Sequence, residues 1–487
     1  MIFKQLKNLL VIALFFITPK AVSQASEKPF SIDDAINLKN VRSPKISPDG
    51  KWIAFTVSEL DLEKDKSETR IWMIPTGGGD AIPMTSKGYS ASQARWSPDN
   101  KYLSFLAAKN DGKTQVWSLN LLGGEAQQLT KIKQGVSGHE WSPDGKRLLL
   151  SIRDPKPEEL TKDKKDDKKA KPFVVDRLQF KRDYKGYLDR YRTHLYTFVP
   201  GDSTAVQITS GDYDDLSPVW KPDGTSIAFV SNRTNNPDGN SNSDIWIVSA
   251  DNTDKGKTLL QLTKNTNADT SPEWSPDGSH LTYTTITDKE AIWYATQKLA
   301  IIPATGGDPK ILAEKLDRNI SNPKFSPDGK QIYFILEESG TSKIASIQPS
   351  GKNFRRIIKG DISIRDYAMI GKFIFPLLGK SLQPHEIYSF KNDKLTKLTG
   401  CNDSIIAHQK KPIVQKIRFK SNDGTPIEGF VVKPIGFDPT MKYPLILWNH
   451  GGPVSQYEFS FHTISQLFAA NGFVTLLINP RGSSGYG

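Results

Sequence analysis

A chain of 487 residues is too long for one ordinary hydrophobic core, so its length predicts at least two domains. Its content of 37% hydrophobic and 24% charged residues is typical of a soluble globular protein and not of a disordered one. The formal net charge of +12 is compatible with a nucleic-acid partner, but an export signal at the N-terminus argues against one, and we expect none.

The first 25 residues have the three parts of a secretory signal peptide. Lys4 and Lys7 give a positive start, Leu9–Ile17 is apolar, and Ser23 and Ala25 are the small residues before a cleavage site after Ala25. The apolar run is well short of the roughly 20 residues that a membrane span needs. We therefore expect an exported, periplasmic protein without stable membrane insertion.

A turn motif recurs six times and organises most of the chain. The copies are ISPDGKWIAF from Ile46, WSPDNKYLSF from Trp96, WSPDGKRLLL from Trp141, WKPDGTSIAF from Trp220, WSPDGSHLTY from Trp274 and FSPDGKQIYF from Phe325. Proline presets a β-turn, aspartate bonds backbone amides, and glycine supplies a permissive backbone. The apolar run after each turn does not alternate with polar residues, which predicts a strand covered on both faces.

A second hairpin follows each turn, so every unit contains four strands. A seventh unit, about 362–399, lacks the turn, and Ser31 marks a helix start before the first unit. Four-stranded sheets stacked around an axis bury both faces of each sheet. We therefore predict a mainly β fold with a seven-bladed β-propeller over residues 26–405, in which the recurrent tryptophans are packing residues. Neither a β-sandwich nor a set of unrelated β domains, the two alternatives, explains six copies of one turn.

An insertion at about 153–192 interrupts the repeat. Its Lys- and Asp-rich run, Lys156–Pro172, predicts a solvated loop. The aromatic and basic stretch Phe173–Tyr196 either lines a central channel or covers a blade. We favour the second, structural interpretation.

Neither thiol nor metal chemistry is indicated. A single cysteine, Cys401, excludes an internal disulfide, and its place in a turn after a strand argues against a nucleophile. The pairs His139-Glu140 and His385-Glu386 both lack the second histidine of a zinc-binding HExxH motif. We expect no metal and no cofactor.

The pattern changes in a second domain, residues 406–487. A hairpin is predicted with Asp423-Gly424 at its turn. A buried strand at Leu445–Trp448, a helix at Phe459–Ala470 and an apolar strand at Phe473–Ile478 then follow. The succession of strand, helix and strand predicts a parallel pair joined by a right-handed crossover.

A tight glycine loop, His450-Gly451-Gly452-Pro453, follows the first of these two strands, and the chain closes on NPRGSSGYG. Together with the propeller repeat and SNDGTPIEGF, these motifs resemble the prolyl oligopeptidase family of serine peptidases, in its acylaminoacyl-peptidase and bacterial dipeptidyl-peptidase-like branch. The repeated turn resembles the TolB-like, or PD40, repeat. The resemblance covers the mature chain and implies that residues 406–487 begin an α/β-hydrolase domain.

The resemblance also implies that the amide of Gly452 is an oxyanion-hole donor. A tetrahedral intermediate carries a negative oxygen, which a fixed N–H must approach within about 3 Å. A Cβ at that place would crowd the substrate. The resemblance assigns Gly451 and Pro453 to the same loop and makes His450 a loop-anchoring residue and not a base.

The nucleophile of an α/β-hydrolase sits in a G-x-S-x-G elbow and precedes the acid and the base. No such motif occurs in the sequence, and we interpret Ser483 and Ser484 as loop residues. We therefore expect the serine, aspartate and histidine to lie C-terminal of Gly487 in a longer exported peptidase that hydrolyses short peptides. The propeller would restrict access, the chain alone would be inactive, and its incomplete sheet would expose an apolar edge.

Two other functions are considered. A non-enzymatic periplasmic TolB-like binding module explains the repeat but not a glycine loop on a parallel strand. An esterase of the same fold would differ in its pocket. Dipeptidyl peptidases of the family hold the substrate amine with paired glutamates, but neither Glu158-Glu159 nor Glu337-Glu338 has the surrounding pattern, so that role is not assigned. Endopeptidase or exopeptidase action and the oligomeric state are left open.

Overall fold

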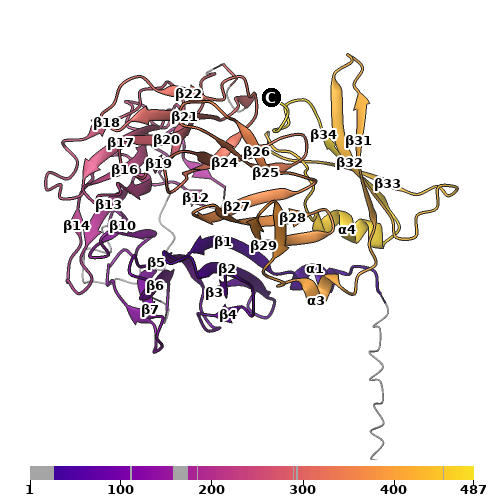
Figure 1. Cartoon of the computed structure of the whole chain (residues 1–487), viewed down its shortest axis with the longest axis horizontal. Coiled ribbons are helices and arrows are strands. Elements are labelled where there is room, and N and C mark those ends of the chain that lie inside the picture. Colours follow the sequence, from indigo (N-terminus) through magenta and orange to yellow (C-terminus); the bar gives the residue numbers. More distant parts are fainter. Residues whose placement is uncertain are drawn as a thin grey trace, which may run out of the picture.

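The computed structural model describes residues 27–109, 112–156, 174–183, 185–288, 290–291, 294–452 and 454–487. The predicted signal peptide, nearly all of the Lys- and Asp-rich run with Glu158-Glu159, and Pro453 lie outside these residues. Figure 1 shows a large body of β-sheets and, beside it, a smaller unit formed by the last part of the chain. In the described ranges, no helix is both long and apolar enough to cross a membrane.

The N-terminal helix α1 (Ile32–Asn37) begins where the sequence predicts, because Ser31 and Asp34 form a capping box. Ser31 Oγ accepts a hydrogen bond from the Asp34 amide at 3.1 Å, and the Asp34 carboxylate accepts one from the Ser31 amide at 3.0 Å. The backbone of Lys28 pairs with Gln409, just beyond the short helix α3 (Asp403–Ile406). This pairing ties the start of the described chain to the segment between the two units.

Residues 40–312 form antiparallel sheets of four strands each. The first three sheets consist of β1 (Asn40–Ile46), β2 (Trp52–Asp61), β3 (Lys66–Pro75) and β4 (Ile82–Pro83); of β5 (Ala91–Trp96), β6 (Tyr102–Ala107), β7 (Gln115–Asn120) and β8 (Gln127–Gln128); and of β9 (Gly138–Trp141), β10 (Leu148–Arg153), β13 (Thr193–Phe198) and β14 (Val206–Gln207). The next two consist of β15 (Leu216–Trp220), β16 (Ser226–Ser231), β17 (Asp244–Ser249) and β18 (Leu260–Gln261), and of β19 (Asp269–Trp274), β20 (His280–Thr285), β21 (Lys298–Pro303) and β22 (Lys310–Leu312). A separate hairpin, β11 (Lys181–Arg182) and β12 (Gly186–Tyr187), belongs to the insertion.

Residues 320–397 form one eight-stranded sheet that divides into two groups of four. Its strands are β23 (Ile320–Phe325), β24 (Ile332–Glu337), β25 (Ser342–Ile347), β26 (Arg355–Ile358), β27 (Ser363–Ile370), β28 (Phe373–Lys380), β29 (Gln383–Lys391) and β30 (Lys394–Lys397). Among the described strands, the only backbone pairing between the two groups is the parallel pairing of Ser342 with Ser363.

The repeated turns have the hydrogen bonds that their sequence predicts. In the first, Asp49 Oδ1 accepts from Ser47 Oγ at 2.6 Å and from the Lys51 amide at 3.1 Å, and Gly50 has φ +71°. Equivalent contacts recur in four further turns, at Asp99, Asp144, Asp277 and Asp328. The same local chemistry therefore starts the second strand of most sheets.

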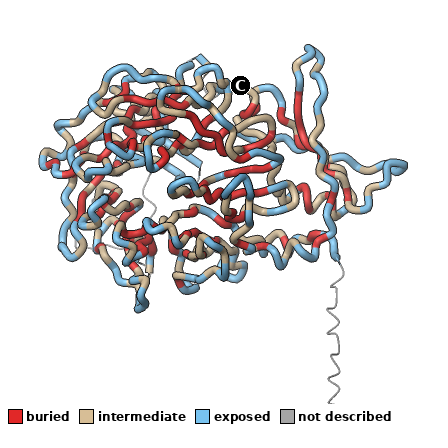
Figure 2. Tube along the Cα trace, in the orientation of Figure 1, coloured by how far each residue is buried: buried red, intermediate tan, exposed pale blue. Residues whose placement is uncertain are grey.

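Hydrophobic clusters join each group of four strands to the next group. Ile71 of the first sheet packs with Phe105 of the second, and equivalent clusters connect each later pair. The last cluster joins Phe375 of β28 to Phe55 of β2, so the succession returns to its start. Figure 2 shows the buried segments inside the sheets. Side-chain packing closes this ring, since β1 pairs only with β2 among the described strands.

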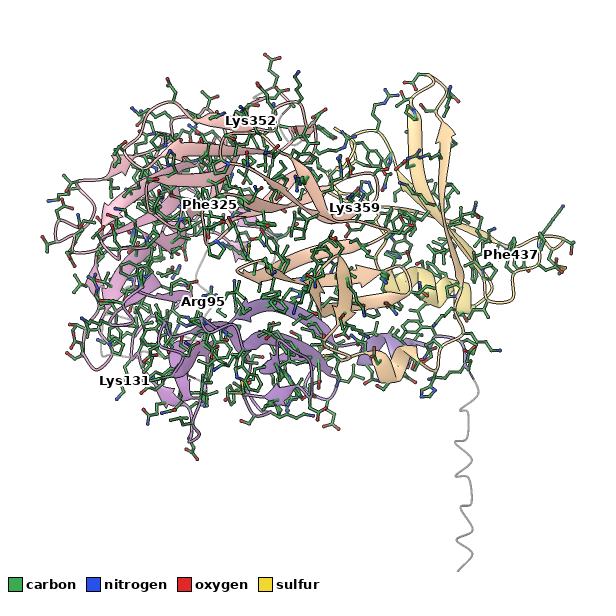
Figure 3. The ribbon with its side chains drawn as sticks, in the orientation of Figure 1. Arg95, Lys131, Phe325, Lys352, Lys359 and Phe437 are labelled. Atoms are coloured by element: carbon green, nitrogen blue, oxygen red, sulfur yellow. The ribbon has the colours of Figure 1, made fainter. Side chains whose placement is uncertain are left out.

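The tryptophans that precede the turns are packing residues, as predicted. Trp96 and Trp274 are buried. Trp96 Nε1 donates to the carbonyl of Lys45 in the preceding sheet at 2.9 Å, and Trp274 makes the equivalent bond to Val219 at 3.3 Å. Phe325, labelled in Figure 3, is buried at the same position of the sixth copy.

The smaller unit is a four-stranded sheet with the order β31-β32-β34-β33. The predicted hairpin consists of β31 (Ile413–Lys420) and β32 (Pro426–Lys433). Strand β33 (Leu445–Asn449) passes through helix α4 (Thr463–Ala470) to β34 (Val474–Asn479), and these two strands are parallel, as predicted. The sheet as a whole is mixed, because β32 and β34 pair antiparallel.

Two details of the sequence interpretation are wrong. Strand β33 is not buried: Leu445 and Leu447 are 60% and 56% exposed, because β33 is an edge strand that pairs only with β34 among the described strands. Helix α4 begins at Thr463 and not at Phe459. The Phe459 amide donates to the carbonyl of Gly340 in the larger body at 2.9 Å. This contact keeps the residues from Phe459 up to Thr463 out of the helix.

Candidate active site

The glycine loop follows the carboxyl end of β33, and one of its glycines is required by the backbone. Gly452 has φ +153°, and a Cβ built there would lie 2.3 Å from the Val454 amide nitrogen. A Cβ on Gly451 would meet no atom within 4 Å. Gly452 is exposed, and its amide forms no hydrogen bond with the backbone of another described residue. This N–H is therefore free to donate to an oxygen of a bound molecule.

His450 connects the glycine loop to the last loop of the chain. Its Nε2 lies 2.8 Å from Ser483 Oγ. The hydroxyl of the buried Ser483 donates to the carbonyl of Pro480 at 2.7 Å, so it accepts from His450. A general base would have to remove the hydroxyl proton of Ser483, but this proton is donated to the Pro480 carbonyl. This contact joins two loops and is not a nucleophile–base pair.

Ser483→Ala should therefore have a small effect on any catalysis at this site. Losing one neutral hydrogen bond costs about 1 kcal/mol, which corresponds to about a fivefold fall in kcat/KM. Removing a serine nucleophile costs roughly 10⁶-fold in kcat. Steady-state kinetics on Ser483→Ala separate the two roles, with Ser484→Ala as the matched control in the same loop. A millionfold loss would identify Ser483 as a nucleophile and overturn this interpretation.

Two residues that the sequence analysis did not single out position the segment after the glycine loop. Asn479, at the end of β34, is buried; its Oδ1 accepts from the Tyr457 amide at 2.7 Å and its Nδ2 donates to the Tyr457 carbonyl at 2.9 Å. Gln456 bonds the Gly340 amide at 3.0 Å and the Thr341 carbonyl at 3.2 Å. Asn479 is the first residue of the motif NPRGSSGYG, so the sequence could have pointed to it. Gln456 belongs to no motif that would have singled it out.

The turn between β24 and β25 docks on the smaller unit through a buried carboxylate. Glu428 of β32 accepts from Ser339 Oγ at 2.7 Å, pairs with Lys416 Nζ at 2.8 Å and accepts from Arg418 Nε at 2.6 Å. Burial raises the pKa of Glu428, but the hydrogen bonds from Lys416 and Ser339 outweigh it and bring the pKa down to about 2. The carboxylate is therefore charged, and it contributes the hydrogen bond from Ser339 to the contact between the two units.

A second carboxylate, Glu458, lies in the same interface. It accepts hydrogen bonds from Ser342 Oγ at 2.6 Å and Ser363 Oγ at 2.5 Å, and burial raises its pKa. His385 Nε2 lies 3.1 Å from Ser363 Oγ, and burial together with the charge of Arg365 lowers the pKa of this histidine to about 3. The histidine is neutral at ordinary pH and does not act as a charged partner of Glu458.

A cavity of about 910 Å³ opens between the two units beside this interface. The smaller unit contributes Val454, Ser455 and Glu458, which follow the glycine loop directly, and the larger body contributes residues between Gln179 and Arg365. The glycine loop thus stands at the edge of an open cavity that can receive a small molecule or a short peptide.

The described residues of the stretch 173–196 line cavities and also form the hairpin β11–β12 and the start of strand β13. Gln179 lines the cavity at the interface. Lys185 lines a second cavity of about 560 Å³ among the inner strands, with the paired side chains of Arg95 and Glu140 (Figure 3 labels Arg95). The inner strands of a ring of sheets lie closest to its axis, which places these charges there.

The other candidates of the sequence are placed as follows. Glu338 is paired with Arg356 and Lys343, whereas Glu337 lines the interface cavity. Burial raises the pKa of Cys401 to about 12, so its thiol is not a nucleophile. Among the described residues, no group of three His, Cys, Asp or Glu side chains is arranged to hold a metal ion.

Relatives of known name are peptidases. The chain is 29% identical to the uncharacterized peptidase YuxL of Bacillus subtilis over 485 residues, covering 95% of this chain and 72% of that protein. It is 27% identical to dipeptidyl-peptidase 5 of Porphyromonas gingivalis, covering 97% and 70% of the two chains. No family model matches the chain. These relatives confirm that the chain is similar to peptidases, as its motifs indicate.

Solved structures show which fold is shared. Pyrococcus horikoshii acylaminoacyl peptidase superposes with a TM-score of 0.75 at 22% identity, covering 92% of this chain; the present chain spans 66% of that structure. The β-propeller domain of the Trilobed protease from Pyrococcus furiosus superposes with a TM-score of 0.53 at 16% identity, covering 75% of this chain and 97% of that domain. The larger body thus has a propeller-like fold.

Proposed function

We propose that the chain is part of a serine peptidase of the prolyl oligopeptidase family that hydrolyses short peptides through an acyl-enzyme. The free amide of Gly452 at the edge of the interface cavity carries this proposal. The peptidase relatives, which match both units and not the propeller alone, support it. The nucleophilic serine, the aspartate and the histidine would be supplied by residues that follow Gly487 in the intact protein.

In the proposed architecture, residues 26–405 form seven blades and residues 406–487 begin an α/β-hydrolase domain. Five four-stranded sheets and the two halves of the eight-stranded sheet supply the blades. The ring of hydrophobic clusters that returns from β28 to β2 supports this count. The propeller would restrict access to the cavity, which favours short peptides over folded proteins. A signal peptide cleaved after Ala25 would deliver the protein to the periplasm.

In the proposed reaction, the serine hydroxyl attacks the scissile carbonyl while the histidine takes its proton, so a C–O bond forms. The carbonyl oxygen becomes negative and accepts a hydrogen bond from the Gly452 amide. Collapse breaks the C–N bond, and the histidine returns the proton to the leaving amine. Water then releases the acyl group by the same steps. His450 and Ser483 hold the glycine loop in place.

Expression of the complete reading frame that contains this chain tests the proposal. The complete protein should hydrolyse chromogenic short-peptide substrates and be labelled by a fluorophosphonate, and the chain ending at Gly487 should do neither. A reading frame without G-x-S-x-G followed by aspartate and histidine, or a complete protein without hydrolysis, contradicts the proposal and leaves the TolB-like binding module. Faster turnover of esters than of peptides would favour the esterase.

A further inference from the structure

The interface cavity contains one cationic side chain that forms no ion pair with a described carboxylate. Arg365 is the only lysine, arginine or histidine among its described lining residues. The side chain is exposed, and no described carboxylate lies within 4.0 Å of its guanidinium. Arg95, which lines the second cavity, is by contrast paired with Glu140. Arg365 is therefore available to a bound anion.

The backbone directs this side chain into the cavity. Arg365 lies on β27, the innermost strand of the last group of four. The pairing of β27 with β28 shifts between Ile364, opposite Leu378, and Asp366, opposite Leu377, so Arg365 is the extra residue of a β-bulge. A bulge turns a side chain away from the regular alternation of the strand. The neighbouring Ile364 also lines the cavity, which places the bulge at its wall.

The acidic groups of the cavity have other partners or lie beyond ion-pair distance of Arg365. Asp238 pairs with Arg177. Glu458 accepts hydrogen bonds from two serine hydroxyls. Glu337 is contacted by Asn319 at 3.4 Å. A planar guanidinium with five donors matches a carboxylate with two parallel hydrogen bonds, which is the most favourable use of a free arginine in a site.

We propose that Arg365 binds a carboxylate of the peptide that occupies the interface cavity, and so selects acidic short peptides. This inference rests on the proposed function, because it assigns the substrate class of the same site. The carboxylate belongs to the C-terminus of the peptide or to an acidic side chain; both present the same planar group to the guanidinium.

Isothermal titration calorimetry on the chain described here tests the inference with three peptides. They are acetyl-trialanine amide, acetyl-trialanine with a free carboxylate, and acetyl-Ala-Glu-Ala amide. A charge-assisted hydrogen bond should make one acidic peptide bind about 10- to 100-fold more tightly than the neutral amide. The acidic peptide that gains affinity identifies the source of the carboxylate.

Arg365→Gln should abolish the preference for that acidic peptide and leave the affinity for the neutral amide unchanged. Arg355→Gln, at an exposed arginine of the same body that does not line the cavity, should behave as the parent chain. Equal binding of all three peptides, or a preference that persists in Arg365→Gln, overturns the inference alone. Absence of binding by every peptide overturns the inference and also counts against a peptide-binding cavity in the proposed function. Thermal melting of both variants confirms that they are folded.

Discussion

Gly452→Ala should lower kcat/KM of the protein expressed from the complete reading frame by about 10²- to 10³-fold, the effect of losing one oxyanion-hole donor. An alanine Cβ would lie 2.3 Å from the Val454 amide nitrogen, so the backbone must move and the Gly452 N–H with it. Because the loop is exposed, the melting temperature should change little. Steady-state kinetics and thermal melting are the two measurements.

The neighbouring glycine supplies the matched control for this experiment. Gly451→Ala adds the same methyl group one residue earlier, where a Cβ meets no atom within 4 Å. Its kcat/KM should stay within about threefold of the parent enzyme, a change of less than 1 kcal/mol in the barrier. If Gly452→Ala retains activity, or if both variants lose it equally, the amide of Gly452 is not the donor.

Glu428→Gln should destabilise the protein by about 1.5 to 3 kcal/mol, because it removes hydrogen bonds to a charged group and leaves the partly buried Lys416 without its anion. Glu428 is buried; it contacts Lys416 and Arg418 of the neighbouring strand β31, and Ser339 across the interface of the two units. Urea denaturation followed by tryptophan fluorescence measures the change. Asp423→Asn, which removes the exposed pair between Asp423 and Arg481, is the matched control and should have little effect.

The difference between parent and Glu428→Gln should also depend on pH. The folded-state pKa of Glu428 is lowered from 4.5 to about 2, so its stabilising effect is complete above the unfolded pKa. As pH falls below 4.5, the unfolded state takes up the proton first and the difference shrinks; it should disappear below pH 2, where the carboxylate is protonated in both states. A difference that is constant from pH 7 to pH 2, or one that grows on acidification, would contradict the assigned role of the charge.

Local chemistry made much of the fold predictable from the sequence. The SPDG turns, the hairpin at Asp423-Gly424 and the capping box at Ser31 are decided by residues within five positions of each other. The parallel crossover from β33 to β34 also followed from a short stretch. Errors arose where partners distant in the chain decided the outcome, as for the exposed strand β33 and the late start of helix α4 at Thr463.

The sequence by itself determined the repeating β units, the change of pattern in the second domain and the glycine loop at Gly452, because turn preferences and hydrophobic periodicity act over a few residues. Only the tertiary structure decided that Gln456 and Glu428 attach this domain to the turn at Ser339, and that Arg365 faces the cavity between the two units. The contacts of Glu428 and Gln456 join residues 89 and 116 positions apart in the chain, and the direction of Arg365 depends on a β-bulge. No local sequence pattern encodes such a distant contact or this bulge.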